Sequence, residues 1–363
     1  MARSSQRRRQ KDRAASDEAF RCVCAVSAAI RTSKLRQNSD PVDVPARSVL
    51  GDYRMGIMMT FRAKTLLLIA AATAPLSGAV AQEAERKFGP WVFGIRGGGY
   101  YQTSTGMDSG GDFDVSRWFL QPSIGYAWDR RNSISLSVGG GETYYNFPGA
   151  AGLGGGDPWG TIRDLRVSLP VRFSPMEEMD VIVIPSVRTN AERGADLDDG
   201  RTEGVLGGFL WRFSDSFAVG PGVGWFTEID GGSNVFPILL IDWDITDTLK
   251  LSTGRGLAAS QGPGLTLSWK AQDDITIGLT GRYESTKFRL DDSGVAPGGV
   301  GEDKSFPLVA TVQYSPWPMA DISAFAGVEF GGELNLQDRN GRNVDSTDYD
   351  PAPIFGVTFS MRF

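Results

Sequence analysis

The feature that most constrains the fold is a unit that recurs along the chain from Trp91 onward. A segment of alternating apolar and polar residues ends in an aromatic residue, a short polar turn follows, and a new alternating segment begins. Between the short turns lie longer segments rich in Gly, Asp, Ser and Pro, so short and long connections alternate. Seven hairpins joined by six short turns predict 14 antiparallel strands, with 12 or 16 as the alternatives. The short turns are at 128–132, 173–180, 213–216, 243–248, 269–274 and 314–321, and the long connections at 102–112, 146–160, 190–201, 229–234, 254–263, 290–304 and 337–350.

The alternation within the predicted strands indicates where the apolar faces point. In the closing strand Phe355, Val357 and Phe359 share one face, and Gly356 and Thr358 share the other. A soluble β-sandwich would show the same period. Aromatic residues at the strand ends and Gly and Ser on the polar faces favour lipid as the apolar environment. In lipid, only a closed barrel leaves no strand edge unpaired, so we expect an all-β, transmembrane antiparallel up-and-down β-barrel.

The residues before the barrel carry a pattern typical of export. Residues 62–64 supply basic charge, residues 66–74 form an apolar run, and Ala79-Val80-Ala81 offers a small-x-small cleavage site. We expect a signal peptide at 55–81, because the run is too short to span a bilayer; a buried core helix is the alternative. Residues 1–54 are interpreted as an over-extended, disordered N-terminus, or else as a long leader. The barrel domain is then 82–363.

Composition excludes several classes of function for the predicted barrel. The chain carries 37 Lys+Arg and 43 Asp+Glu, and its basic excess is confined to the residues before the barrel, so nucleic acid is not an expected partner. The chain has no histidine, and its two cysteines are Cys22 and Cys24. We therefore expect no Cys/His metal site and no cofactor in the barrel. Without histidine as a general base we expect no enzyme, although a Ser/Lys or carboxylate-pair mechanism stays open.

The end of the chain carries a motif of its own. Gly356, Phe359, Met361 and the terminal Phe363 resemble the C-terminal sorting signal of outer-membrane barrels. With the short turns and the export signal, residues 82–363 are similar to bacterial porin-like β-barrels, including uncharacterised proteobacterial families. The similarity to barrels that take up hydrophobic compounds is weaker, because those carry an N-terminal plug and here only 82–90 precede the first strand. The resemblance implies a Gram-negative outer membrane, with lipid, lipopolysaccharide and the barrel-insertion machinery as partners.

Strand parity also places ionic side chains on the predicted lumen face. They either brace the wall as Arg–carboxylate ladders or form a charged constriction that selects solutes. One sharper hypothesis is a basic strip on adjacent strands, opposed by two glutamates across the barrel. The predicted lumen-lining residues are Arg96, Arg166, Arg172, Arg188, Arg212, Arg282, Glu284 and Glu329, of which Arg166, Arg172, Arg188 and Arg212 make the strip.

Three patterns in the long connections have structural and functional interpretations. Residues 152–156 are Gly-rich and indicate a flexible loop, because a phosphate loop would need a Lys and a following helix. Residues 338–345 indicate a hairpin tip rather than a calcium loop, since Asn340-Gly341 favours a type I′ turn. Acidic clusters in the connections are either solvated or bridged by divalent cations to lipopolysaccharide. They are Asp196, Asp198, Asp199, Asp291, Asp292, Glu302, Asp303, Asp345, Asp348 and Asp350.

These features together predict a passive channel or uptake pore for small solutes. The alternatives are a non-conducting structural or surface-interaction barrel and a carrier of hydrophobic compounds. Sequence leaves the three open, because lumen width depends on strand tilt and shear.

Overall fold

The computed structural model describes residues 90–148, 153–253 and 264–363. The expected signal peptide at 55–81 and residues 1–54 lie outside the described residues. Within them, no helix has the length and apolar character needed to cross a membrane. The strand segments are β1 (Trp91–Gly106), β2 (Asp112–Ala127), β3 (Ser133–Asn146), β4 (Thr161–Ser168), β5 (Val171–Met176), β6 (Met179–Glu192), β7 (Arg201–Ser214), β8 (Phe217–Thr227), β9 (Ser233–Asp244), β10 (Leu249–Thr253), β11 (Gly264–Lys270), β12 (Ile275–Arg282), β13 (Glu284–Arg289), β14 (Val300–Trp317), β15 (Ala320–Gln337), β16 (Asn343–Tyr349) and β17 (Ala352–Arg362).

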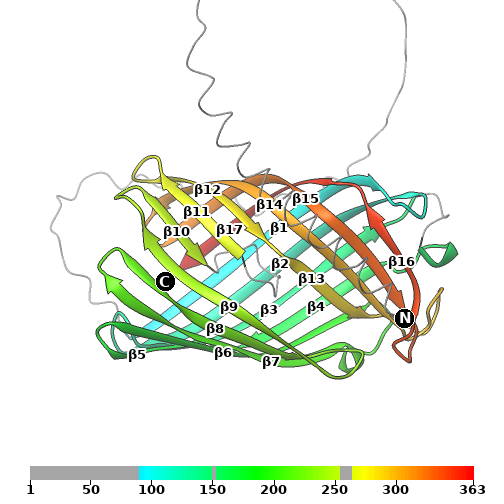
Figure 1. Cartoon of the computed structure of the whole chain (residues 1–363), viewed down its shortest axis with the longest axis horizontal. Helices are drawn as coiled ribbons and strands as arrows, with labels where there is room; N and C mark the ends of the chain where they lie inside the picture. The colour runs from blue at the N-terminus through cyan, green and yellow to red at the C-terminus, as the bar shows by residue number, and fades with distance from the viewer. Residues whose placement is uncertain (1–89, 149–152, 254–263) are drawn as a thin grey trace, which may run out of the picture. The chain divides into compact units, whose positions relative to one another are not determined.

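The strand segments close into one antiparallel barrel (Figure 1). Neighbours in the chain pair with each other, and β1 pairs with both β2 and β17, which closes the ring. Three strands are interrupted: β4 and β5 both pair with β3 and β6, β12 and β13 with β14, and β16 and β17 with β15. Counted as continuous strands they give the predicted 14-stranded β-barrel, which is confirmed.

The connections divide the barrel into a short-turn end and a long-loop end. All six predicted short turns separate consecutive strands in the structure, and the turn between β14 and β15 is only residues 318–319. Four long connections are clearly shorter than expected, at 107–111, 193–200, 290–299 and 338–342. The assignment of Glu302, Asp303, Asp345 and Asp348 to loops is therefore wrong. Pairing with a neighbouring strand overrides the low strand propensity of these polar segments, because it satisfies their backbone groups. The predicted connection 254–263 lies outside the described residues.

The outer face of the wall is apolar. Leu165, Val167, Phe355 and Val357 are each about half exposed, and they alternate with residues that point inward. Large aromatic side chains are exposed at all six short turns: Trp128, Phe173, Phe213, Trp243, Trp269, Tyr314 and Trp317. A belt of apolar side chains with an aromatic rim matches a hydrocarbon layer and its interface.

A bulge redirects one strand toward the lumen. The pairing of β14 with β15 shifts register between Lys304 and Phe306, opposite Gly331, whose φ of 58° lies in the left-handed region. The extra residue inverts the inward parity beyond it. As a result Leu334 and Leu336 point inward and are 0 % exposed. The bulge therefore supplies apolar side chains to the inside of the long-loop end.

Candidate functional site

The lumen contains a polar cavity of about 590 Å³ at the short-turn end. The turn residues Thr246, Asp247 and Thr248 lie at this end, and the remaining lining comes from β1, β9, β10, β11, β12, β14, β15 and β17. Most lining side chains are hydroxylated or charged. The hydroxylated ones are Thr246, Thr248, Ser252, Thr266, Ser268, Thr276, Thr280, Thr311, Ser323, Thr358 and Ser360, and the charged ones are Arg96, Lys250, Lys270, Arg282, Arg362, Asp244, Asp247 and Asp321.

Several of the lining charges are held in defined positions. Lys250 pairs with Asp244 at 3.1 Å and also with Asp242. The carboxylate of Asp321 accepts hydrogen bonds from Gln313 at 3.0 Å and from Ser360 at 3.0 Å. The cavity therefore offers solutes a lining with fixed positive and negative groups and a surplus of hydroxyls.

An aromatic step lies beside the cavity on the inner wall. Phe325 lines the cavity and packs with Val309 and Ile354 in a small buried apolar cluster, against which Tyr100 also packs. The rings of Tyr100 and Phe325 meet edge-on with centroids 6.4 Å apart. A Cβ at Gly356 would lie 2.6 Å from the Phe325 ring, so glycine at this position leaves room for the ring.

A belt of buried polar groups lies next to this step. Asp303 accepts hydrogen bonds from the hydroxyls of Tyr145 at 2.8 Å and Tyr349 at 3.2 Å. Arg117 lies over the Tyr100 ring at 5.1 Å and donates to Thr143 at 2.7 Å. Our site prediction missed Asp303, because its sequence context resembles a polar loop and only the pairing of β14 places it inside. Charge-assisted hydrogen bonds of this kind fix the geometry of the inner wall.

The opposite part of the wall carries the predicted arginines of β4 and β6. Arg188 is 5 % exposed, and its Nε donates to Asp164 at 2.6 Å and to Asn190 at 3.0 Å. Arg166 lies directly opposite Arg188 in the β4–β6 register. These two arginines are thus brought together as expected, and Asp164 supplies a negative charge beside them through its ion pair with Arg188.

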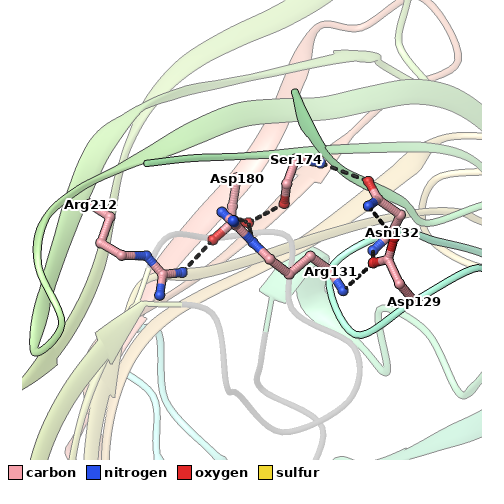
Figure 2. Close-up of polar contacts among 6 residues, drawn as sticks. All are labelled: Asp129, Arg131, Asn132, Ser174, Asp180 and Arg212. Carbon is pink, nitrogen blue, oxygen red and sulfur yellow. Dashed lines mark hydrogen bonds and ion pairs between the residues drawn. The ribbon is translucent and has the colours of Figure 1, made fainter. Parts of the chain in front are cut away.

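Arg212 lies at the short-turn end in a separate polar cluster (Figure 2). Asp180 accepts hydrogen bonds from Arg131 at 2.9 Å and Arg212 at 2.9 Å, and also from Ser174. Ser174 is further tied to the β2–β3 turn through Asn132. The cluster therefore joins the β2–β3 turn to the neighbouring ends of β5, β6 and β7 (Figure 2). Its geometry is that of a brace at the rim.

The single basic strip opposed by glutamates is not what the structure shows. Arg188 and Arg212 each pair with an aspartate on a neighbouring strand, and Arg282 pairs with Glu284, two residues along the chain. Arg172 pairs in register with Ser133 and Ile182, toward the short-turn end. Neighbours in a sheet lie about 5 Å apart, so an arginine reaches them before it reaches across a lumen. Arg96 and Arg282 line the cavity, and Glu329 is buried. A role in solute selection stays a prediction for all eight.

The long-loop end is filled by a buried apolar cluster, here called the cap. It gathers inward-facing residues of β2–β4, β13 and β15–β17 with residues of three connections. Leu153 of the Gly-rich segment is 0 % exposed in it, and the amide of Gly154 donates to Asp345 at 2.9 Å, so the described part of this segment is packed rather than flexible. The cap consists of Met107, Phe113, Val115, Tyr145, Leu153, Trp159, Ile162, Phe288, Leu290, Ala296, Leu334, Leu336, Tyr349 and Ala352.

The remaining predicted features are placed as follows. Phe359, Met361 and Phe363 lie on the exposed outer face, and the backbone of Phe363 exchanges two hydrogen bonds with Phe93. Asn340 and Gly341 form the tip of a hairpin closed by a bond from the Asp338 amide to Arg342, as predicted. The described residues contain no group of three or more acidic or Cys side chains arranged to hold a metal ion.

The closed antiparallel wall, its apolar outer belt and its aromatic rim define a β-barrel of the type that spans bacterial outer membranes. No protein-family model matches the sequence, and no curated protein matches it. Solved structures with a similar fold include an outer membrane channel from Pseudomonas putida F1, which is 10% identical with a TM-score of 0.43 and covers 79% of this chain and 100% of its own. A Pseudomonas aeruginosa FadL homologue is 12% identical with a TM-score of 0.40, covering 75% of this chain and 89% of its own. The KdgM porin is 9% identical with a TM-score of 0.30, covering 74% and 99%. Their likeness to this chain is one of barrel architecture.

Proposed function

We propose that this barrel is an outer-membrane channel for the passive passage of small polar solutes. The observation that supports it best is the hydroxyl- and charge-lined cavity inside a wall whose outer face is apolar. A barrel with a purely structural role does not need a polar cavity of about 590 Å³. In this proposal the cavity is the part of the solute pathway that lies below the cap.

The chemistry of the lining favours polar solutes over hydrophobic compounds. A hydrophobic molecule in this cavity would strip water from hydroxyls such as those of Thr276, Thr311 and Ser323 without supplying hydrogen bonds in its place. A small hydrated solute keeps those bonds. The alternative of a carrier of hydrophobic compounds therefore has little support from this lumen.

The short-turn end faces the periplasm in this proposal, since bacterial barrels place short turns there. The cavity then opens toward the periplasm, and the cap occupies the end that faces the outside. In this proposal the channel is in a state in which the cap closes its outer end.

Partners and catalysis are further parts of the proposal. The apolar belt supports contact with membrane lipid, while contact with lipopolysaccharide and recognition by the insertion machinery are expectations from the charged connections and the terminal Phe363. We propose no enzymatic activity, on the ground that the chain lacks histidine.

Ionic conductance of the refolded protein in planar lipid bilayers tests the proposal. We expect discrete current steps in potassium chloride that scale with salt concentration. Correct insertion is checked separately by the heat-modifiable mobility of the same preparation. An inserted barrel that passes no current over a wide range of voltage would identify a non-conducting structural barrel instead.

A further inference from the structure

One strand segment leaves the regular order of the wall at the long-loop end. β12 pairs with β11 and β14, and after Tyr283 the chain continues as β13, which keeps β14 as its antiparallel neighbour. At its end β13 meets β6 in a parallel contact between Arg289 and Ala191. In the order of the wall, β7 to β11 lie between β6 and β13. The segment therefore reaches across the end of the barrel rather than along its wall.

Polar contacts hold the end of β13 against connections on the far side. Arg289 donates to the carbonyl oxygens of Asp199 at 3.1 Å and Ile229 at 2.8 Å, in the β6–β7 and β8–β9 connections. Lys287 pairs with Glu228 at 2.9 Å and with Asp230 at 3.0 Å. Arg289 also donates to the carbonyl oxygen of Gly298 at 2.9 Å, in the connection that follows β13. The other partners of the two cations belong to connections on the side that β13 reaches.

Phe288 of β13 and Leu290, the first residue of the connection after it, point the other way, into the cap. Phe288 is 0 % exposed and meets Trp159 edge-on with ring centroids 5.0 Å apart. Leu290 is 2 % exposed in the same cluster. Period-2 alternation therefore turns the end of β13 so that Phe288 and Leu290 face the cap and Lys287 and Arg289 face the far connections.

Both ends of this segment have features that let a strand turn. Tyr283 interrupts the strand between β12 and β13. The connection 290–299 contains Gly294 and Gly298 with φ of 78° and 60°, a region that glycine enters without strain. β13 is paired with β14 along its whole length, but one bridge and side-chain contacts are what join it to the far side. A segment of this kind can pivot about its pairing with β14 and leave the far side without breaking the wall, as hinged elements do in other proteins.

We propose that β13 and the connection 290–299 form a gate that closes the outer end of the lumen, latched by Lys287 and Arg289. The inference rests on the proposed channel function. In the latched state Phe288 and Leu290 complete the cap. Release of the two cations lets the segment swing aside and uncovers the apolar residues beneath it.

A reversible cross-link tests the gate. In the full chain carrying Cys22→Ser and Cys24→Ser, Ala191→Cys with Arg289→Cys places two thiols at paired positions of a β-bridge, within reach of a disulfide. The oxidised protein should pass no current in a planar bilayer, and a reductant should restore steps to the same inserted protein. A matched pair, Val187→Cys with Glu203→Cys, joins two strands that are already paired in the wall and should conduct whether oxidised or reduced. Current through the fully oxidised Ala191–Arg289 pair overturns the gate, whereas silence of the wild type contradicts the channel itself.

A second measurement reads the gate without any current. Leu336→Cys places a thiol in the buried cap, where a membrane-impermeant maleimide added from outside reaches it only when the segment moves. Adding Lys287→Met and Arg289→Met should raise the labelling rate about fivefold, because two partly buried polar anchors are lost. Arg201→Met, which removes an exposed pair with Glu203 in the wall, is the control and should leave the rate unchanged. Equal rates in the latch variant and the control would show that β13 is a fixed part of the wall.

Discussion

Arg188 of β6 donates from Nε to Oδ2 of Asp164 on β4 at 2.6 Å, and the pair joins two interior strand positions of the wall. The arginine side chain is almost fully buried, whereas the aspartate is a quarter exposed. A buried guanidinium with an ionic partner is expensive to leave alone. Substitution of either partner should therefore destabilise the barrel, and most strongly when the buried arginine is left without its carboxylate.

Asp164→Leu should lower the free energy of unfolding by about 3 kcal/mol, because it leaves the Arg188 charge buried without its carboxylate. Reversible urea unfolding from lipid vesicles measures the change. The double variant Asp164→Leu with Arg188→Met removes both charges and should recover most of the loss. A double variant as unstable as the single one would show that packing, not the ion pair, stabilises this site.

The charge of the cavity should influence the ions that pass. Arg96 lines the cavity and is exposed to it, so Arg96→Glu should shift the reversal potential in a salt gradient toward cation selectivity. The matched control is Arg131→Gln at the rim brace, which should leave selectivity close to that of the wild type. A reversal potential unchanged by Arg96→Glu would place the conducting path elsewhere.

The aromatic ring of Phe363 should matter for assembly into the membrane, whereas the backbone of Phe363 makes the hydrogen bonds with Phe93. Phe363→Ala keeps the two backbone hydrogen bonds with Phe93 but loses an exposed ring, and deletion of Phe363 loses both. If Phe363 is a sorting signal, both changes should sharply reduce the heat-modifiable protein in the outer-membrane fraction. Phe363→Tyr retains the ring and should restore the yield. A normal yield from Phe363→Ala would show that the aromatic ring of Phe363 is not recognised during assembly.

Opposite faces of β12 should tolerate charge differently. Leu279 is half exposed on the outer belt, and Leu279→Arg should cost about 2–4 kcal/mol if the position lies at the bilayer midplane. Thr280, the next residue, lines the cavity, where an arginine side chain remains hydrated. Thr280→Arg should therefore cost much less in the same vesicle unfolding experiment. Equal costs at the two positions would contradict the assignment of faces.

The contribution of Asp129, in the β2–β3 turn, to the stability of the fold should depend on pH. The Asn132 side chain and the amide of Arg131 donate to its carboxylate, and these bonds hold its pKa below the ordinary value of 3.8. A depressed pKa contributes stability that is present above the ordinary pKa and lost as pH falls through the folded one. Asp129→Ala should thus be less stable than the wild type at neutral pH. The difference should vanish at pH values below the folded pKa, as followed by unfolding midpoints across an acid series.

The class of fold could be predicted from local sequence patterns alone. Aromatic residues before each short turn, such as Trp128 and Trp269, and the parity of Phe355 and Val357 are local patterns, and a period of two leaves little choice but paired strands. A chain that must satisfy every backbone group in lipid then has to close. The strand count followed because each short turn separates two strands in the chain.

The contents of the barrel interior depend on contacts between strands that are distant in the chain. The bulge at Gly331 inverts parity and sends Leu334 and Leu336 inward, and no local pattern marks where such an insertion falls. Arg188 and Arg212 take partners from neighbouring strands, a choice set by register between segments distant in the chain. The same holds for Asp303, which pairing of β14 carries from an apparent loop into the lumen. Side-chain direction along one strand is a local property, whereas which side chains meet depends on how strands align and cross, and that is fixed only when the whole ring closes.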